Sequence, residues 1–381
     1  HGAKFMIFRR LGALLLFLLA ATPAAAEIST SANHAILMDG ATGQVLWAKD
    51  AFTPMPPASM SKLMTIELLF QRIKDGRVKL TDTFPVSERA WRERSGSECF
   101  VNIGDRMSVE NLIQCIIVVS GNDSTIVVAE ALGGTVEGFV PMMNQRAREL
   151  GLKQSHFVNP DGLDLPPGQM MSAFDLAKLA RHIVVAYPAL YHFFGEKDFV
   201  WSNIRQPNRN PVLFNTPGAD GLKTGHLQAS GYGLVASAVR DGRRIVLVAN
   251  GLASEKDRAD EGARLLEIGF REFRSYALFK PGDAVAIADV FGGAEKSVPL
   301  TVKAPVVVTL QVDSRPAMKV AVRYAAPLNA PLAAGRQVGT LVVTAPDFPG
   351  LTVPLYPAHA VDRAGILGRM WLGLRALFGM K

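Results

Sequence analysis

The order of strand-like and helix-like segments constrains the fold of this chain more than any other feature of its sequence. Hairpins are predicted around Asp39–Gly43 and Asp241–Gly242, where turn residues separate β-like runs. Helical patterns run from Ser59 to about Asp75, through most of 106–183, and from Asp257 to Phe273. Strands at both ends of this body, with helices between them, favour an antiparallel sheet with packed helices over a repeated βαβ unit.

The predicted secondary structure changes at about Pro281, from mixed helices and strands to strands alone. Five short β-rich runs follow, separated by Gly, Pro, Asp and Asn, and no helical pattern returns before the C-terminal tail. The runs are Ala284–Val290, Ser297–Val302, Val306–Val312, Lys319–Tyr324 and Val338–Val343. This pattern predicts a small all-β domain.

The N-terminus has the pattern of a secretory signal. Lys4, Arg9 and Arg10 precede the apolar run Leu11–Ala21, and small residues before Glu27 offer a cleavage site. The apolar run is short for a membrane span, although an uncleaved anchor remains an alternative. We therefore expect an exported protein that works at the periplasmic face of the cytoplasmic membrane.

The net charge of +7 does not indicate a nucleic-acid partner. Three of the net positive charges lie in residues 1–26 and three in residues 358–381, which leaves the body of the chain close to neutral. A nearly neutral body lacks the basic surface that binds a phosphate backbone.

The C-terminal tail is predicted to be an amphipathic helix on the membrane surface. Its apolar residues recur at helical spacing and form one sector of a helix: Ile366, Leu367, Met370, Trp371, Leu374, Leu377 and Phe378. Arg369 and Arg375 flank that sector, where they would meet anionic head groups. The alternative to membrane attachment is a helix that docks on the β domain or on a second subunit.

Two cysteines and seven histidines give little support for a metal site or a disulfide framework. The histidines are scattered, so we expect no metal and no cofactor. In an exported protein Cys99 and Cys115 could pair, but Cys115 lies in the apolar stretch 112–117. That setting favours a buried, inert thiol.

Three short motifs occur in order along the body of the chain. They are Ser59-Met60-Ser61-Lys62, Ser120-Gly121-Asn122 and Lys223-Thr224-Gly225. Each is weak alone, since Ser31-Ala32-Asn33 also matches the second pattern. Their order and wide spacing in an exported protein are typical of penicillin-binding proteins and class A β-lactamases.

The residue types suit acyl transfer to a serine. On a helix, Ser59 and Lys62 lie on one face, which brings an amine close to the hydroxyl. Lys62 can be a base if burial and a second cation, Lys223, lower its pKa. Ser120 can relay protons, and the amide of Asn122 can hold Lys62 and a substrate carbonyl.

The third motif is predicted to line the cleft as a strand. Lys223 and Thr224 offer a cation and a hydroxyl to a terminal carboxylate. Gly225 has no side chain, so a substrate peptide can lie against the strand edge.

Beyond these motifs, nearly all of the mature chain resembles the low-molecular-mass penicillin-binding D-alanyl-D-alanine carboxypeptidases, a serine DD-peptidase family. Segments similar to that family are Pro57–Thr65, Ser120–Asp123, Asp220–His226, Asn208–Asn210, and His156-Phe157 with Gly162-Leu163. The resemblance implies an oxyanion hole from the backbone N–H groups of Ser59 and His226. It also implies that Arg258 helps to hold the substrate carboxylate, although a solvated helix charge is a serious rival interpretation for Arg258. For the side chain of His226, a wall residue is favoured over a proton carrier.

The resemblance also implies a fold, an activity and partners. The expected fold is α+β, with a β-lactamase/transpeptidase-like antiparallel sheet and helical clusters, followed by a small all-β domain that acts as a spacer. The expected division is a signal at 1–26, a catalytic domain at 27–277, a β-rich domain at 278–356 and an anchor helix at 358–381. The enzyme would remove the terminal D-Ala from peptidoglycan stem pentapeptides, for cell wall biogenesis and cell shape, and β-lactams would acylate it.

Three alternatives remain open at this point. A β-lactamase of the same fold is disfavoured because no Glu-x-x-Leu-Asn segment lies between the second and third motifs. The sequence distinguishes poorly between a carboxypeptidase and a DD-endopeptidase that cleaves cross-links. A non-catalytic wall-binding or β-lactam-sensing module is disfavoured because all three motifs are intact.

Overall fold

A five-stranded antiparallel sheet forms the centre of the first domain in the computed structural model, which describes residues 28–93 and 95–365. The strand order is β2-β1-β9-β8-β7, so strands from the start of the chain pair with strands from the end of this domain. The strands are β1 (His34–Asp39), β2 (Val45–Lys49), β7 (Ala219–Leu227), β8 (Gly231–Arg240) and β9 (Arg243–Leu252). Strand β7 lies at one edge of the sheet, which leaves one of its sides without a partner strand.

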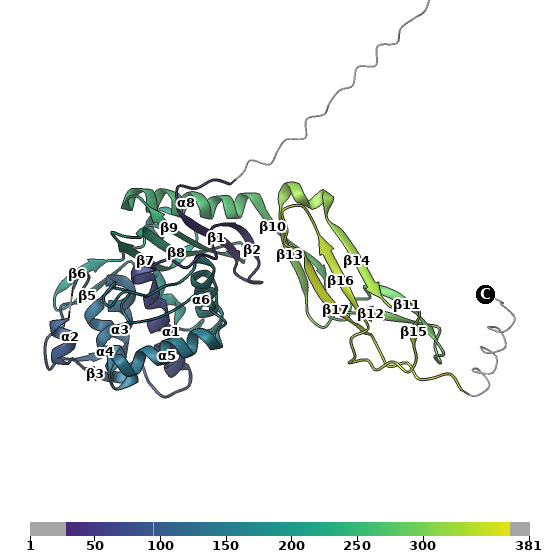
Figure 1. The fold of residues 1–381 in the computed structure, drawn as a ribbon, viewed down its shortest axis with the longest axis horizontal. Helices are drawn as coiled ribbons and strands as arrows, with labels where there is room; N and C mark the ends of the chain where they lie inside the picture. Colours follow the sequence, from purple (N-terminus) through teal and green to yellow (C-terminus); the bar gives the residue numbers. More distant parts are fainter. Residues whose placement is uncertain (1–27, 94, 366–381) are drawn as a thin grey trace, which may run out of the picture.

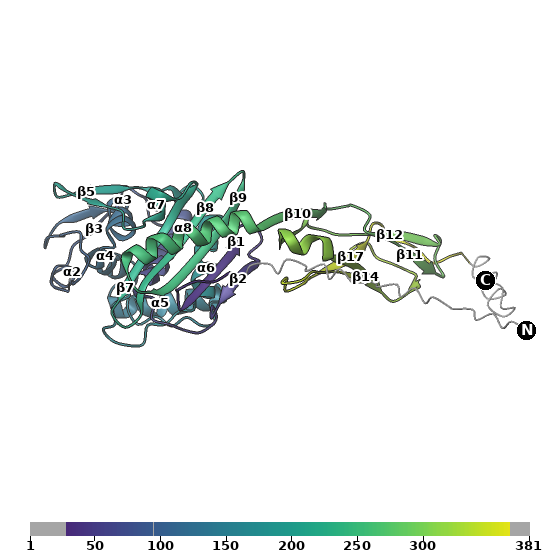
Figure 2. The ribbon, with the colours of Figure 1, turned by 90° about the horizontal axis from the view of Figure 1, so that it is seen from above.

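Helices cover both faces of this sheet. Helix α8 (Glu255–Glu272) lies across one face, as Figure 2 shows, and α6 (Ala173–Ala186) packs on the other. Strand β1 shows the alternation that results: Leu37 packs in the core beneath α8, whereas Ile36 belongs to the core of the helical layer. A strand that is buried on both faces has a nearly continuous apolar sequence, as β1 has.

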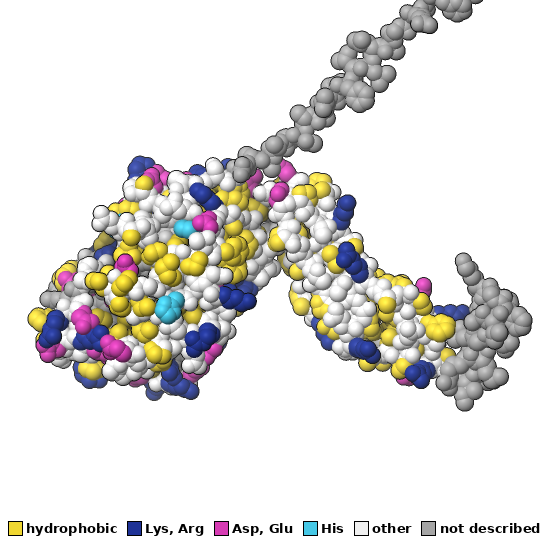
Figure 3. Space-filling model, in the orientation of Figure 1, with side chains coloured by type: hydrophobic (Ala, Val, Ile, Leu, Met, Phe, Trp, Pro, Cys, Tyr) yellow, Lys and Arg dark blue, Asp and Glu magenta, His cyan; other side chains and the backbone are white. Residues whose placement is uncertain are grey.

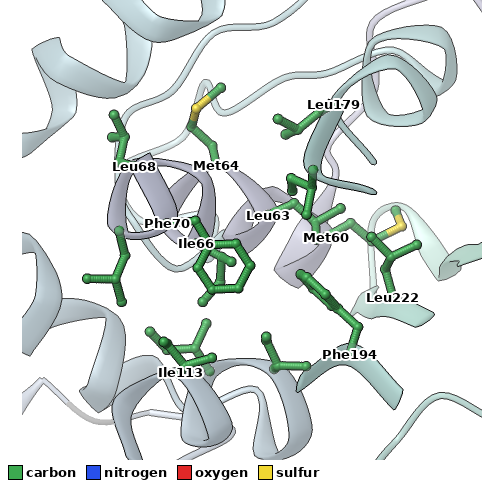
Figure 4. Packing of buried hydrophobic residues seen from close by; sticks show 14 of the residues in the cluster. Met60, Leu63, Met64, Ile66, Leu68, Phe70, Ile113, Leu179, Phe194 and Leu222 are labelled. Carbon is green, nitrogen blue, oxygen red and sulfur yellow. The ribbon is translucent and has the colours of Figure 1, made fainter. Parts of the chain in front are cut away.

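The helical layer is built around α1 (Lys62–Lys74), which the short 3₁₀ turn η1 (Ala58–Ser61) precedes. Side chains of α1 pack at the centre of the largest core cluster, where Phe70 contacts Phe194 (Figure 4). The other helices of the layer are α2 (Glu88–Arg92), α3 (Val109–Gln114), α4 (Asn122–Gly133) and α5 (Val136–Glu149), with the 3₁₀ turn η3 (Tyr191–Gly195). The short helix α7 (Val212–Asn215) instead packs against α8 and β7. Two small two-stranded sheets complete the domain: β3 (Thr83–Pro85) with β4 (Arg106–Ser108), and β5 (Asp198–Trp201) with β6 (Ile204–Pro207).

The second domain consists almost entirely of strands and has a separate core. Strand β10 (Phe273–Phe279) pairs with β13 (Val306–Gln311), and six other strands form a sheet in the order β14-β16-β17-β12-β11-β15. These six are β11 (Ala286–Phe291), β12 (Ser297–Thr301), β14 (Lys319–Tyr324), β15 (Leu328–Asn329), β16 (Gly339–Thr344) and β17 (Leu351–Pro357). One 3₁₀ turn, η4 (Val312–Ala317), follows β13. The predicted fold class, an α+β domain followed by an all-β domain, is confirmed.

Two strands of the second domain differ from the sequence-based expectation. The expected boundary after residue 277 falls inside β10, which pairs with β13 of the second domain. Strand β17, which contains Pro354 and Pro357, follows Val338–Val343, the last of the predicted β-rich runs, and was not expected. Its prolines are tolerated because only parts of β17 are paired with each neighbour.

The segment after β17 is also not the helix expected from residue 358. Residues 358–365 are extended, and bridges join Val361 to Leu332 and Arg363 to Gly293. Val361 is buried in the core of the second domain, which explains why this segment follows the sheet. The predicted signal at 1–26 and the predicted anchor from residue 366 onward lie outside the described residues.

The two cysteines form a disulfide, so the expectation of a buried free thiol was wrong. Cys115 begins a π-helical turn, η2 (Cys115–Val119), that directly continues α3. Cys99 lies in the loop between α2 and β4, and the Cα atoms of the two residues are 5.9 Å apart. The apolar setting of Cys115 does exist, but it contains the partner cysteine as well.

Polar contacts join the two domains where β1 and β2 meet β13. The side-chain amide of Gln44 donates to the carbonyl oxygen of Thr309 at 2.6 Å, and its oxygen accepts from the N–H of Thr309 at 3.1 Å. The Thr309 hydroxyl donates to Asp39 at 3.0 Å. Beside these contacts lies a notch between the domains with apolar walls that include Trp47 and Phe348, and Figure 3 shows hydrophobic side chains gathered there.

Within residues 28–93 and 95–365, no single helix has the length and apolar character needed to cross a membrane. One bent pair, α4 with α5, reaches the required length and composition together, with an 83° angle between its halves.

Candidate active site

A cleft of about 280 Å³ lies between the free edge of β7, the turn η1 and the start of α4. All three sequence motifs contribute to its walls. The lining residues are Ser59, Gly96, Ser97, Ser120, Asn122, Leu163, Arg209, Thr224, Gly225, His226, Tyr232, Glu255 and Arg258.

Ser59 and Lys62 are in direct contact at the bottom of this cleft. The Nζ atom of Lys62 lies 2.7 Å from the Oγ atom of Ser59, as expected for residues one helical turn apart. Lys62 is fully buried, and this burial, with a smaller contribution from the charge of Arg209, lowers its pKa to about 8. Arg209 is a cation that the sequence did not suggest, and it acts beside Lys223, whose amine is coupled to that of Lys62 by mutual repulsion. An amine with a pKa near 8 can accept the proton of the serine hydroxyl at neutral pH.

The loop at residues 157–171 contacts Lys62, the expected base, through a backbone carbonyl group. The backbone carbonyl of Asp161 accepts a hydrogen bond from Lys62 Nζ, and the Pro160 carbonyl accepts one from Thr65 at 2.7 Å. Gly162 has φ +88°, and a Cβ atom there would lie 2.0 Å from the carbonyl oxygen of Ala58. Only glycine fits at this position, because the loop backbone touches the turn that carries the nucleophile.

Gly225 allows β7 to approach the nucleophile. A Cβ atom on Gly225 would lie 3.0 Å from the Pro57 carbonyl oxygen and 3.1 Å from the backbone nitrogen of Ser59. The missing side chain thus serves the contact between β7 and η1, in addition to the substrate edge that the sequence suggested. Because β7 is an edge strand, it also has backbone groups available on its open side.

Ser120 and Lys223 form the second polar pair of the cleft. Lys223 Nζ lies 2.9 Å from Ser120 Oγ and 3.0 Å from the carbonyl oxygen of Thr224. Burial, together with the nearby charge of Lys62, lowers the pKa of Lys223 well below its ordinary value. Ser120 has a left-handed backbone (φ 66°), which serine rarely adopts. Such a conformation persists where the surrounding structure holds it, frequently at active sites.

Asn122 contacts a different partner from the one suggested by the sequence. Its side-chain amide donates to the carbonyl oxygen of Ser95, and no hydrogen bond to Lys62 is present. Its Oδ1 atom is buried and unpaired, which leaves an acceptor free at the cleft. The Asn122 side chain can reach Ser95 because the loop that contains Ser95 and Cys99 runs beside α4.

The remaining walls carry cations and aromatic rings. Arg258 is buried (7% exposed) in the first turn of α8, and its guanidinium carbon lies 5.4 Å from the centre of the Tyr232 ring. Burial lowers the pKa of Arg258, so the rival interpretation as a solvated helix charge was wrong. His226 is exposed and stacks on Tyr232, with ring centres 4.0 Å apart, which places it in the wall.

Arg209 lines the cleft and was missed as a functional residue. Its guanidinium donates to the hydroxyl of Ser97, which also lines the cleft. The sequence did contain a signal, because Arg209 is the centre of Asn208-Arg209-Asn210, one of the segments that carried the family resemblance. Ser97, Tyr232 and Glu255 also line the cleft, and nothing in the sequence pattern singled them out.

The structure therefore brings all nine predicted site residues into one region. Seven of them line the cleft, Gly225 among them, and the other two, Lys62 and Lys223, are hydrogen-bonded to Ser59 and Ser120, which line it. Among the residues described, no cluster of His, Cys, Asp and Glu is suited to hold a metal ion.

Comparisons with known proteins agree with this geometry. Residues 20–253 match the family described as D-alanyl-D-alanine carboxypeptidase, and residues 273–363 match the C-terminal domain of penicillin-binding protein 5. The chain is 36% identical over 377 residues to D-alanyl-D-alanine carboxypeptidase DacC of Escherichia coli K12, covering 94% of this chain and 93% of that one.

Solved structures show the same two-domain arrangement. Penicillin-binding protein 5 from Haemophilus influenzae superposes with a TM-score of 0.81 at 32% identity, covering 89% of this chain and all of that one. The D-alanyl-D-alanine carboxypeptidase DacD from Francisella tularensis gives a TM-score of 0.78 at 31% identity, with 89% and 95% covered.

Proposed function

Since the chain belongs to the D-alanyl-D-alanine carboxypeptidase family, we propose that its cleft removes the terminal D-Ala of peptidoglycan stem pentapeptides through an acyl-enzyme on Ser59. The protein is a hydrolase of the penicillin-binding type. The observation that carries the assignment of Ser59 is its 2.7 Å contact with a buried lysine whose pKa is lowered to about 8.

In the first step, neutral Lys62 takes the proton of Ser59 Oγ while that oxygen attacks the carbonyl carbon of the penultimate D-Ala. The negative charge that develops on the carbonyl oxygen would be stabilised by the backbone N–H groups of Ser59 and His226. Both residues line the cleft, and Gly225 keeps β7 close enough to Ser59 for the two groups to converge.

In the second step, the peptide bond breaks and the leaving amine of the terminal D-Ala takes a proton. Ser120 is positioned to deliver it, because its hydroxyl is hydrogen-bonded to Lys223. The proton that Lys62 took from Ser59 would pass by way of Lys223 to Ser120 and replace the one delivered, so that Lys62 is neutral again. A water molecule then attacks the acyl carbon and gives a proton to Lys62, the ester bond to Ser59 Oγ breaks, and that proton returns to Ser59.

The carboxylate of the terminal D-Ala would lie among Thr224, Arg209 and Arg258. Thr224 offers a hydroxyl, and the two guanidiniums, which also line the cleft, would provide charge-assisted hydrogen bonds. The Nε atom of Arg258 is buried and has no hydrogen-bond partner among the described residues, so it has a donor available for an anion.

A β-lactam would acylate Ser59 in the same way. Its leaving amine stays tethered in the cleft, so hydrolysis of that adduct would be slower than hydrolysis of the peptide acyl-enzyme. No observation favours a β-lactamase, an endopeptidase or a non-catalytic module over the carboxypeptidase.

The location of the protein is part of the same proposal. The N-terminal signal pattern supports export, and the amphipathic sequence from residue 366 onward supports attachment to the periplasmic face of the cytoplasmic membrane.

Release of D-Ala from diacetyl-Lys-D-Ala-D-Ala tests the activity, and labelled penicillin tests the nucleophile. The purified protein should release D-Ala, and mass spectrometry should place the penicillin label on the peptide that contains Ser59. The variant Ser59→Ala should do neither, whereas Ser61→Ala, two residues away and outside the cleft lining, should still be labelled. A penicillin label that persists in Ser59→Ala would show that another residue is the nucleophile.

A further inference from the structure

The Cys99–Cys115 disulfide joins two segments that both reach the cleft, although neither cysteine lines it. Cys99 belongs to what we call the wall segment, residues 95–101, whose members Gly96 and Ser97 line the cleft. Cys115 begins the π-helical turn η2, and Ser120 directly follows the end of that turn. Both cysteines are buried, at 1% and 0% exposure.

Cys115 also holds the backbone that presents Ser120. Its carbonyl oxygen accepts the N–H groups of both Ser120 and Gly121, the latter at 3.0 Å. These hydrogen bonds close the turn that places Ser120 in its left-handed conformation, with its hydroxyl 2.9 Å from Lys223. A shift of Cys115 would therefore move the hydroxyl that we assign to proton delivery.

The wall segment makes its other contacts with site residues through short polar links. The carbonyl oxygens of Ser95 and Ser97 accept from the side chain and the backbone of Asn122, the latter at 2.8 Å. The Ser97 hydroxyl accepts from Arg209. The backbone nitrogen of Cys99 donates to buried Asp123 at 2.9 Å. The wall segment is otherwise an irregular loop, and a loop without a regular ladder depends on such ties for its position.

We propose that the Cys99–Cys115 disulfide is a positioning element of the active site, which fixes the wall segment and the Ser120 turn relative to each other. It acts through Ser120, Asn122 and Ser97, and it touches no reacting atom. The proposal rests on the roles given above to Ser59 and Ser120. It predicts that loss of the bond lowers the rate of acylation even when the protein stays folded.

Three variants distinguish the effect of losing the disulfide from the effect of losing side-chain packing. They are Cys99→Ala, Cys115→Ala and the double variant. If the bond matters, each single variant removes it completely, and the double variant should be no worse than either single one. If only packing matters, the double variant should lose more than either single one, because it removes both side chains.

The measurement is acylation by benzylpenicillin, resolved into the rate constant at saturation and the concentration that gives half of that rate. We expect the saturating rate constant to fall by about tenfold to a hundredfold, because a misplacement near 1 Å of a reacting group has effects of that order. The ratio of turnover between peptides with a free C-terminal carboxylate and the corresponding amides should also fall, because Arg209 would no longer be held by Ser97.

Met143→Ala is the matched control. Met143 is fully buried in the same core cluster, on α5, and does not line the cleft. It should lower the melting temperature as the cysteine variants do, without changing the saturating rate constant at a temperature where all the proteins are folded. A count of free thiols in denatured wild-type protein should give none.

Wild-type acylation rates in all three folded cysteine variants would overturn the proposal, as would additive losses or two free thiols in the wild type. These results differ from failure of the proposed function, which would appear as wild-type protein with no penicillin label on Ser59.

Discussion

At Ser59 the reaction depends on the proton that Lys62 must be free to accept. Burial lowers the pKa of Lys62 to about 8, so its neutral and reactive fraction grows as the pH rises toward that value. We predict that the rate constant for acylation by benzylpenicillin rises about tenfold per pH unit below about pH 8 and levels off above it. A series of stopped-flow measurements across this range gives the profile.

Lys62→Arg provides the control for this profile, because a guanidinium keeps its proton and should be inactive at every pH. A wild-type profile that bends near 10.4, the ordinary lysine value, would contradict the lowered pKa. A flat profile would show that proton transfer to Lys62 does not limit acylation.

The two arginines of the cleft make a second prediction at the same scale. Removing the charge by Arg209→Gln or Arg258→Gln should lower turnover of peptides with a free C-terminal carboxylate by roughly ten- to a hundredfold. The corresponding C-terminal amides should be turned over slowly by the wild type and be little affected by either substitution. The comparison of acid and amide substrates isolates the contact with the carboxylate.

Arg205→Gln is a fair control for these substitutions. Arg205 lies on β6, four residues before Arg209, and pairs with Asp198 outside the cleft. It should leave both substrates unaffected. Equal losses on acid and amide in Arg209→Gln would mean that this arginine supports the wall and does not bind the carboxylate.

Most of these side chains could be identified from the sequence, because their spacing within each motif reflects local geometry. Ser59 and Lys62 lie on one helical turn, and that turn alone places their polar atoms in contact. The partner of Asn122 could not be predicted, because Ser95 comes from a loop whose position depends on tertiary contacts. Arg209 was missed for the same reason, since its place in the cleft depends on how β6 ends.

At the scale of elements, the loop 157–171 contributes to catalysis through its close contact with η1. Gly162→Ala would place a Cβ atom against the Ala58 carbonyl oxygen at a position with φ +88°. We predict that this substitution slows acylation of Ser59 by more than about tenfold, because the loop and the turn must separate. Acylation by labelled penicillin and the melting temperature should be measured together.

Gly168→Ala in the same loop is the control. Gly168 also has a positive φ, of 114°, but the nearest atom to an added Cβ would be a Val158 methyl carbon at 3.8 Å. Gly168→Ala therefore has the conformational cost of an alanine at positive φ, on the order of 1 kcal/mol, without a close contact between the added Cβ atom and a neighbour. Similar acylation rates in the two variants would show that the fit of Gly162 against η1 is not needed for the reaction.

The elements themselves were largely predictable, with informative exceptions. The two hairpins of the sheet carry strong turn signals, and both occur where the sequence placed them. Strand β17 was missed because its prolines argue against a strand until its partial pairing is known. The disulfide was not predicted because its partners are held together by Asp123 and the η2 turn, neither of which has a signature in sequence.

At the scale of the whole molecule, the second domain is elongated. The first domain adjoins it at β10 and β13, and the described chain leaves it at the other end, near β11 and β15 (Figure 1). If the residues after 365 attach to a membrane, the cleft is held away from that surface by the length of the second domain. This arrangement would let a peripheral enzyme reach the cell wall.

We predict that a protein that ends after Gly365 loses membrane attachment and keeps its activity on soluble peptides. The cut must follow Gly365, because Val361 belongs to the core of the second domain and Arg363 is bridged to Gly293. A cut at residue 357 would mix loss of the anchor with loss of that packing. After signal cleavage, fractionation should place the full chain with membranes and the shortened chain in the soluble fraction.

Washing with salt distinguishes how the segment binds. Because Arg369 and Arg375 flank the apolar sector, anionic lipid should strengthen binding to vesicles, and salt should weaken it only in part, since the apolar contact is insensitive to screening. The double variant Leu374→Asp/Leu377→Asp, at full length, is the control, because it interrupts the apolar sector and keeps both arginines. If this variant or the shortened chain still partitions with membranes, the attachment lies elsewhere. If the full chain is soluble as well, the segment docks on protein and the spacer does not face a membrane.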